Sequence, residues 1–261
     1  DFRAMPAEVS GYAGVKWVNV HPDNKEKDIP TVMAKIILSN PETGENLACI
    51  EGTYLTNYRT GAAGGIAAKY LARENSDVLG LVGLGEQAKT QLRAVSEVFD
   101  LQKVLIYDID QKTVKDFENS FDGFKFEETS LEGAMSADIV STTTPVRNAI
   151  IKKEWVSPGT HINAIGADAE GKQEIDSQLL VEDEVKIIVD DIEQTTHSGE
   201  INVAYNEGTI NEGDVYANLP DVVAGKKPGR QSREEITIFD STGLAIQDIA
   251  TAKIAYKRAI S

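Results

Sequence analysis

Apolar and β-branched residues gather in short runs at the start of the chain and predict a small sheet. The runs cover residues 15–20, 31–38 and 47–51. The last two are separated by residues 40–44, where Asn, Pro and Gly form the kind of cluster that turns the chain between antiparallel strands. We therefore expect antiparallel strands to open the chain.

After this sheet, the pattern changes to apolar runs that alternate with stretches of helical periodicity. A helix rich in alanine is expected at residues 59–72, where three glycines allow close packing of the backbone. Such alternation is typical of βαβ units in a parallel sheet. The strands are expected at residues 78–82, 103–107, 137–142, 161–165, 185–189 and 236–239, and the helices between them at 86–99 and 111–120.

The last helical stretch, residues 244–259, carries its apolar residues on one face. We expect it to join the first sheet in a discontinuous α+β domain, residues 1–65 and 244–261. The inserted α/β domain, residues 66–243, is predicted to hold a doubly wound parallel sheet.

Composition and charge exclude several classes of protein. The chain has 261 residues, of which 41% are hydrophobic, and no apolar run approaches the ~18 residues of a membrane helix. Its 42 acidic and 26 basic side chains give a formal charge of −16, which argues against nucleic acid as a partner. The single Cys49 cannot form an internal disulfide. We therefore expect a cytoplasmic protein that binds neither nucleic acid nor a membrane.

A glycine motif after the strand at 78–82 predicts a dinucleotide site. Gly83 allows the tight turn into the next helix, Gly85 lets the backbone approach a pyrophosphate, and Ala88 keeps the helix close to the sheet. The first helical residues, Glu86 and Gln87, then lie at the helix end that faces the diphosphate. The inserted domain is thus predicted to be Rossmann-like.

Asp108 ends the next strand, twenty residues beyond Ala88. An acid at this position hydrogen-bonds the adenine ribose and repels a 2′-phosphate, which favours NAD over NADP as cofactor. The alternative interpretation of Asp108 is an ordinary turn residue at the end of a strand.

Further motifs cover essentially the whole chain, and in this order they resemble the ornithine cyclodeaminase/mu-crystallin family. They are RAMP at 3–6, GVKWVNVHP at 14–22, PTV at 30–32, TNYRTGAA at 56–63, NAIGAD at 163–168, GKQE at 171–174, HSGEI at 197–201 and FDSTGLAIQD at 239–248. The resemblance implies a homodimer whose first domain supplies dimer contacts and substrate ligands. It also implies that full-length members carry an opening strand and helices ahead of the sequence given.

The resemblance assigns the substrate-binding residues. Lys16 matches a lysine that binds the substrate carboxylate or transfers a proton, and its alternative is a solvated charge on an edge strand. Arg59 matches an arginine that reaches substrate carboxylate and cofactor, as a bidentate guanidinium can; its alternative is a surface arginine at a helix start. Arg3 stands where cyclodeaminases of the family carry an acid and alanine dehydrogenase-like members carry arginine.

The resemblance also assigns Asp168 as the catalytic carboxylate, at the carboxyl end of a strand, where open α/β sheets bind their ligands. Its alternative is a turn residue. Lys172 and Ser241 fit cofactor contacts, and Thr31 fits a phosphate or pocket hydroxyl. For these three residues, ordinary turn or strand-end roles stay open.

The reaction implied is oxidation of a small amino acid to an imine, followed by water attack that releases ammonia and a 2-oxo acid. Because Arg3 disfavours ornithine, an alanine dehydrogenase-like enzyme or imine reductase ranks first. A redox-neutral cyclodeaminase ranks second, and a crystallin-like binding protein third.

Two polar residues within strands invite other interpretations. His161 lies in an apolar strand and is interpreted as a core histidine. Asp240 is interpreted either as catalytic or as a cap of the following helix. The sequence shows no His/Cys cluster for zinc and no nucleophile elbow.

Overall fold

The computed structural model describes residues 2–27 and 29–261, and the chain divides into two compact units. Unit 1 comprises Asp1–Arg59 and Gly243–Ser261, and unit 2 comprises Thr60–Thr242. The sequence places these boundaries after residues 65 and 243. The roles expected for the two domains stay predictions.

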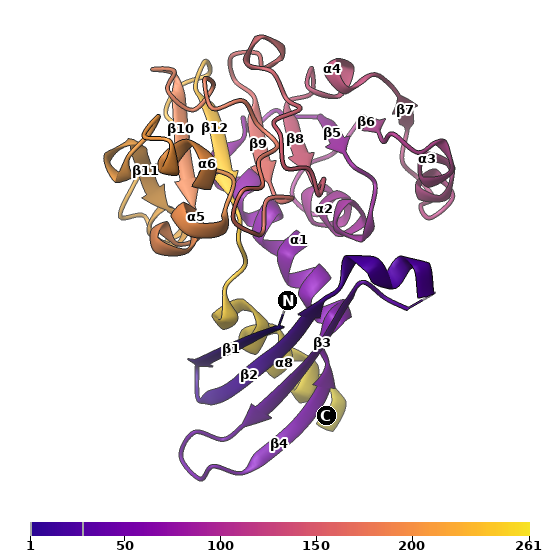
Figure 1. Cartoon of the computed structure of the whole chain (residues 1–261), viewed down its shortest axis with the longest axis vertical. Coiled ribbons are helices and arrows are strands. Elements are labelled where there is room, and N and C mark those ends of the chain that lie inside the picture. The colour runs from indigo at the N-terminus through magenta and orange to yellow at the C-terminus, as the bar shows by residue number, and fades with distance from the viewer. Residues whose placement is uncertain (1, 28) are drawn as a thin grey trace. The chain divides into compact units, whose positions relative to one another are not determined.

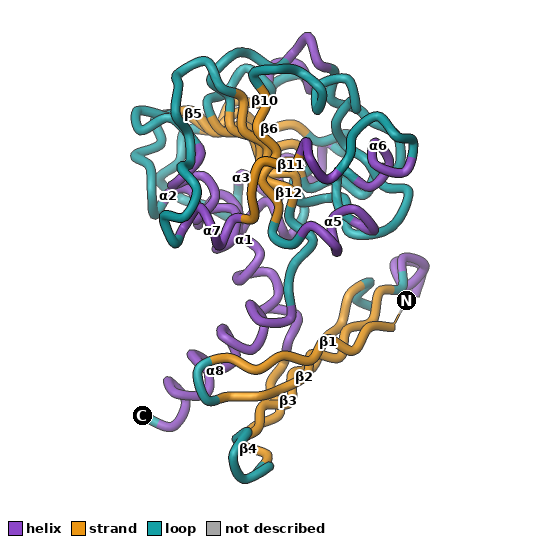
Figure 2. Tube along the Cα trace, turned by 90° about the vertical axis from the view of Figure 1, so that its left-hand side faces the viewer, coloured by secondary structure: helices purple, strands orange, loops and turns teal. Residues whose placement is uncertain are grey.

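Unit 1 is an antiparallel sheet in the order β1-β2-β3-β4, covered on one face by the last helix (Figures 1 and 2). Its core joins Ile36 and Leu38 of the sheet to Ile249 and Ala252 of that helix. Gly14 lets the helix approach, because a Cβ there would lie 2.8 Å from the Ile249 side chain. The elements are β1 (Phe2–Val9), β2 (Tyr12–Val20), β3 (Val32–Ser39), β4 (Asn46–Glu51) and α8 (Ala245–Ile260), with the short 3₁₀ helix η1 (Pro22–Lys27).

Strand β1 is absent from the sequence-based prediction. It contains Pro6, which cannot donate a ladder hydrogen bond and argues locally against a strand. The structure accommodates Pro6 because β1 lies at the edge of the sheet and pairs with β2 alone.

Helix α1 (Gly52–Leu71) begins seven residues before the expected start at Arg59. The Glu51 carboxylate accepts hydrogen bonds from the backbone N–H groups of Thr53 and Tyr54, at 2.9 and 3.2 Å, and so satisfies the first turn. The sequence prediction assigned Glu51 to a strand and therefore missed this cap.

Unit 2 is an eight-stranded sheet in the order β11-β10-β12-β9-β8-β5-β6-β7, and every pairing in it is parallel (Figure 1). The chain runs outward from β5 through β6 and β7, then returns to place β8 on the other side of β5. This reversal creates the crevice where doubly wound sheets bind ligands. The strands are β5 (Val78–Val82), β6 (Lys103–Tyr107), β7 (Phe126–Glu128), β8 (Ile139–Thr142), β9 (His161–Ala164), β10 (Val185–Val189), β11 (Val215–Asn218) and β12 (Ile236–Asp240).

Helices cover both faces of this sheet, which confirms the predicted doubly wound α/β fold. One hydrophobic cluster joins the sheet to α1, α2 and α3, a second joins it to α1 and α7, and a third packs its opposite face against α4 and α6. The helices are α2 (Glu86–Ser96), α3 (Gln111–Glu118), α4 (Leu131–Ala134), α5 (Ile192–Ser198), α6 (Asn202–Asn206) and α7 (Leu219–Val223), with 3₁₀ helices η2 (Lys153–Trp155) and η3 (Glu212–Asp214).

His161 lies in the core of unit 2, as the sequence indicates. Its two ring nitrogens contact Thr237 Oγ1 and Asn163 Oδ1 at 2.9 and 3.0 Å. Burial lowers the pKa of His161 to about 3, so the ring stays neutral and structural.

Across residues 2–27 and 29–261, no helix is both long and apolar enough to cross a bilayer.

Candidate functional site

A buried group of charges lies in unit 1, where β2, α1 and α8 meet. The Lys16 ammonium lies 2.7 Å from Asp248 Oδ2, and Arg59 Nε donates to Asp248 Oδ1 at 3.0 Å. Arg59 Nη1 also donates to Gln247 Oε1 at 3.3 Å. Lys16 is 1% exposed and Asp248 is completely buried. We call Lys16 and Arg59 the cation pair, and Asp248 is the carboxylate that they share.

The register of the sheet explains why Lys16 points inward. Lys16 pairs with Met5 on one side and with the buried Ile36 on the other. Side chains of paired residues share a face of the sheet, so Lys16 faces α8 beside Ile36. The interpretation of Lys16 as a solvated edge charge is therefore wrong.

Gly243 makes room for the guanidinium of Arg59. Its φ of +78° lies in the left-handed region, and a Cβ there would lie 2.3 Å from Arg59 Nη1. A side chain at position 243 would displace Arg59, so the turn before α8 needs glycine for two reasons.

The surroundings of Lys16 lower its pKa towards neutral pH. Burial lowers the pKa of Lys16 to about 8; Arg59 and, less strongly, Arg3 lower it too, while Asp248 opposes them. Arg3 lies on β1 and is electrostatically coupled to Lys16. The group can therefore hold a carboxylate with permanent charge from Arg59, while Lys16 gains or loses a proton near neutral pH.

Sequence reasoning did not assign a role to Asp248. A signal was present, because Asp248 precedes the apolar Ala252 by four residues and so lies on the same buried face of the helix. A carboxylate on an apolar helix face indicates a buried partner of opposite charge.

The glycine turn in unit 2 has the geometry that a dinucleotide site needs. Gly83 adopts a φ of +80° and donates its N–H to the carbonyl of Tyr107. A Cβ at Gly85 would meet no atom within 4 Å, and Gly85 caps α2 without a side-chain hydrogen bond. Ala88 is completely buried. The start of α2 thus offers open space and backbone donors to an anion.

Asp108 supports this turn directly. Its Oδ2 accepts the N–H of Leu84 at 2.8 Å, and its Oδ1 accepts the N–H of Asp110 at 2.9 Å. These bonds give Asp108 the turn role that the sequence left open. Because a carboxylate has about four acceptor sites, contact with ribose hydroxyls stays compatible with them. The ribose role remains a prediction.

Three other predicted cofactor residues lie in the first turn of α2 and just before β3. The exposed Glu86 forms an ion pair with Lys89 at 2.6 Å. Thr31 precedes β3, five residues before the partner of Lys16, which corresponds to roughly 16 Å along a strand. Gln87 lies in the first turn of α2.

Asp168 and Lys172 form an ion pair of 2.5 Å after the carboxyl end of β9. The Asp168 side chain is 42% exposed, so it is accessible to a ligand. Ser241 follows β12, is 4% exposed and donates its N–H to the carbonyl of Ala164 at the end of β9. Within the described residues, its hydroxyl has no hydrogen-bond partner. Lys172 thus contacts Asp168, and its contact with a cofactor stays a prediction.

Buried carboxylates tie together the loops at this end of the sheet. Glu174 accepts the N–H groups of Thr144 and Gly166, at 2.7 and 2.8 Å. Glu200 accepts the N–H of Ile175 at 2.7 Å. Burial raises the pKa of Glu200 well above its usual value, and repulsion from Glu174 adds to the rise. These carboxylates hold the segment that carries Asp168.

Asp240 belongs to the same cluster, and its interpretation as a cap of the following helix is wrong. Its Oδ2 accepts the N–H of Ile201 at 3.0 Å, and its side chain is completely buried. Burial raises the pKa of Asp240 to about 8, and repulsion from Asp190 and Glu174 adds to the rise. Asp240 joins the loop before α6 to β12.

Asp240→Asn should flatten the pH dependence of stability. An unfolded Asp loses its proton near pH 4, whereas folded Asp240 keeps it to about pH 8. Unfolding releases this proton between those values, so raising the pH lowers the free energy of unfolding by up to about 1.4 kcal/mol per pH unit. Urea unfolding at pH 5 and pH 7.5 should show a smaller difference in the variant. Asp183→Asn, on an exposed loop, should keep the original difference.

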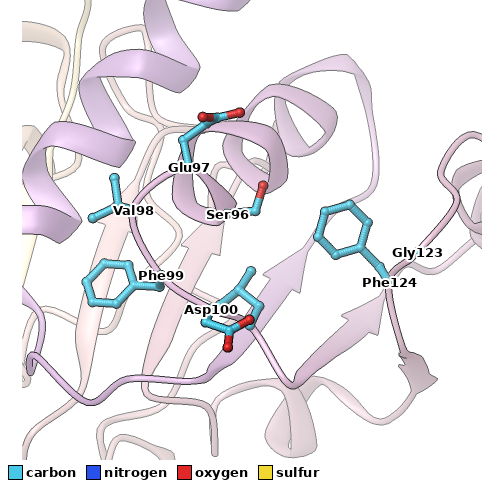
Figure 3. Close-up of a pocket in the computed structure, with 8 residues that line it drawn as sticks. Ser96, Glu97, Val98, Phe99, Asp100, Gly123 and Phe124 are labelled. Atoms are coloured by element: carbon cyan, nitrogen blue, oxygen red, sulfur yellow. The ribbon is translucent and has the colours of Figure 1, made fainter.

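A surface pocket lies elsewhere in unit 2 (Figure 3). It is lined by Ser96, Glu97, Val98, Phe99, Asp100, Leu101, Gly123 and Phe124. Leu101 and Phe124 precede β6 and β7, so the pocket lies at the amino ends of these strands, away from the glycine turn. It carries none of the predicted site residues.

Comparisons with known proteins cover the full chain. Residues 1–261 match the ornithine cyclodeaminase/mu-crystallin family. An alanine dehydrogenase of Archaeoglobus fulgidus is 55% identical over 263 residues, which cover 100% of this chain and 81% of the relative.

Two solved structures extend the likeness. An archaeal alanine dehydrogenase dimer with bound NAD has a TM-score of 0.97 and 55% identity, over 100% of this chain and 81% of that one. A Δ1-pyrroline-2-carboxylate reductase of Thermococcus litoralis, in complex with NADH and L-proline, has a TM-score of 0.91 and 38% identity. That match covers 99% of this chain and 87% of the reductase.

Proposed function

Because the chain belongs to the ornithine cyclodeaminase/mu-crystallin family, we propose that it is an NAD-dependent oxidoreductase that oxidatively deaminates a small L-amino acid, as an alanine dehydrogenase does. The observation that carries the proposal is the buried cation pair, Lys16 and Arg59. Two buried cations that share one carboxylate retain an excess of positive charge, which suits a substrate carboxylate.

Different residues of this chain bind the substrate and transfer its protons. Arg59 and Lys16 bind the substrate carboxylate, and Arg3 adds positive charge near Lys16. Asp168 accepts the proton of the substrate amine, and Asp168 or Lys16 then orients the water that hydrolyses the imine. NAD supplies the hydride acceptor when bound.

The residues of unit 2 fit NAD. The open space at Gly85 admits a pyrophosphate, and the buried hydroxyl of Ser241 offers a donor that has no protein partner among the described residues. The relatives in complex with NAD or NADH support the same cofactor.

The test is absorbance of reduced nicotinamide with a panel of amino acids. A dehydrogenase produces NADH and ammonia with alanine or another small amino acid. Ornithine consumed without net NADH would instead show a cyclodeaminase, and cofactor binding without turnover of any amino or imino acid would show a binding protein. Arg3 favours the first outcome, because its positive charge, added to that of Lys16 and Arg59, disfavours the extra amine of ornithine.

Asp108→Asn should narrow the preference for NAD over NADP. The amide oxygen can still accept the N–H of Leu84, while the charge that repels a 2′-phosphate is gone. Titrating the protein with each cofactor, while recording protein fluorescence, measures the ratio of its affinities for NAD and NADP. Equal affinities in the unmutated protein would contradict the proposed role, and Asp183→Asn should leave the ratio unchanged.

We also propose a homodimer, as in the archaeal relative. The sheet face of unit 1 opposite α8 exposes Phe2, Trp17, Met33 and Ile37, by 64, 48, 37 and 44%. An apolar face of this kind is typical of a dimer interface. Light scattering of the full-length protein should give twice the mass of one chain.

A further inference from the structure

Asp248 is the point at which the two cations of unit 1 meet. Each of its carboxylate oxygens faces a different cation, with Oδ1 accepting from Arg59 and Oδ2 lying against the Lys16 ammonium. The two partners come from different elements, since Lys16 lies on β2 and Arg59 on α1. Asp248 is completely buried, so water does not compete for these contacts.

The position of Asp248 on α8 suits a negative charge. Asp248 lies in the first turn of the helix, where the partial positive charge of the backbone stabilises a carboxylate. Helix α8 packs against β1, β2 and β3, so its first turn is held by the core of unit 1. The carboxylate is therefore a fixed anchor for the two longer and more flexible cations.

The neighbour Gln247 extends this anchor. Its Oε1 accepts from Arg59 Nη1 at 3.3 Å and from the N–H of Leu244 at 3.1 Å. Two consecutive residues of α8 thus hold Nε and Nη1 of the same guanidinium. This arrangement fixes the plane of Arg59, which a bidentate contact with a carboxylate requires.

Without Asp248, the two cations would repel each other in a buried place. Lys16 would then lose its charge first, because the guanidinium of Arg59 stays protonated at any pH a protein tolerates. An uncharged Lys16 cannot form an ion pair with a substrate carboxylate.

We propose that Asp248 is a positioning residue, which keeps Lys16 charged beside Arg59 and so lets both hold the substrate carboxylate. This inference rests on the proposed function for its effect on activity. Its effect on Lys16 itself is independent of which substrate the enzyme uses.

Asp248→Asn tests the proposal in the full-length enzyme. The amide keeps the size of the side chain and an acceptor for Arg59, but it removes the charge. We expect kcat/KM for the amino acid to fall about 10- to 100-fold at pH 7.5, the scale of a loss of substrate orientation, mainly through KM. The affinity for NAD should change less than kcat/KM, because most of the predicted cofactor contacts lie in unit 2 and the amide still accepts from Arg59.

The pH profile separates this role from a purely structural one. In the unmutated enzyme, burial lowers the pKa of Lys16 to about 8. Loss of the opposing charge should lower the pKa of Lys16 by about one unit or more. The fall of kcat/KM at alkaline pH, where Lys16 loses its proton, should therefore begin at a lower pH in Asp248→Asn. Asp248→Glu keeps a negative charge at this position, so its pH profile should lie closer to that of the unmutated enzyme.

NMR titration of ¹³C-labelled lysine follows Lys16 directly, with its signal assigned by its loss in Lys16→Met. Glu45→Gln is the control, because it removes a carboxylate from the exposed turn between β3 and β4. An unchanged Lys16 titration in Asp248→Asn would overturn the proposal. If both Asp248→Asn and Asp248→Ser fail to fold, Asp248 is required for folding, and the positioning role is overturned as well.

These measurements also distinguish failure of this inference from failure of the proposed function. If no amino acid yields NADH with the unmutated enzyme, the proposed function fails. The Lys16 titration still decides the role of Asp248, since it requires no turnover.

Discussion

Asp168→Asn should lower kcat by about 10²–10⁴ and leave the affinity for NAD unchanged. This range is typical of the loss of a general acid–base group. Asn has nearly the same size as Asp, and the Asp168 side chain is 42% exposed, so a loss of packing does not account for such an effect. Steady-state kinetics with a saturating amino acid, together with cofactor titration, measure both quantities.

The ion pair with Lys172 sharpens the interpretation of this variant. Lys172→Met removes the partner but keeps the Asp168 carboxylate, so kcat should fall less than in Asp168→Asn. Asp183→Asn makes the same chemical change on an exposed loop of unit 2 and should leave kcat unchanged. Near-normal turnover of Asp168→Asn would return Asp168 to a turn role and move the proton chemistry to Lys16.

Lys16→Met should lower kcat/KM by about 10²–10³, with a large rise in KM. The variant keeps an unbranched side chain in a buried place and removes the charge that the substrate carboxylate needs. Removing one member of a buried, hydrogen-bonded charge pair costs about 2–5 kcal/mol, and part of that cost falls on the substrate complex. Initial rates across a range of amino-acid concentrations separate KM from kcat.

A matched control for this change is Lys257→Met, which removes a lysine from the exposed last turn of α8. It should leave both constants unchanged. An unchanged KM in Lys16→Met would contradict the role of Lys16 in binding the carboxylate and would place that role on Arg59 and Arg3.

The predicted site residues differ in how the structure places them. Lys16 and Arg59 lie together, and Arg3 is electrostatically coupled to Lys16. Gly83, Gly85, Ala88 and Asp108 lie at one turn, and Asp168 and Lys172 contact each other. Thr31 lies farther along the sheet of unit 1. The roles of all these residues remain predictions until variants are measured.

The interior of the parallel sheet is the part that could be predicted most closely. Residues 78–82, 103–107 and 185–189 were expected as strands and match β5, β6 and β10 at both ends. Strands buried on both faces are continuous apolar runs bounded by polar residues, so their ends are visible locally. Strand β1 and the start of α1 were missed because Pro6 argues against a strand and Glu51 caps the helix from a strand end.

The sequence by itself determined the class of the fold, the glycine turn with its following acid, and the family to which the chain belongs. These follow from local periodicity and from motifs of a few residues. Only the tertiary structure decided that Lys16 points inward and that Asp240 joins a buried acidic cluster. Only it showed that Asp248, 189 residues from Arg59, holds the two cations. Periodicity tells which face of an element is buried, whereas the packing of distant elements decides which charges meet there.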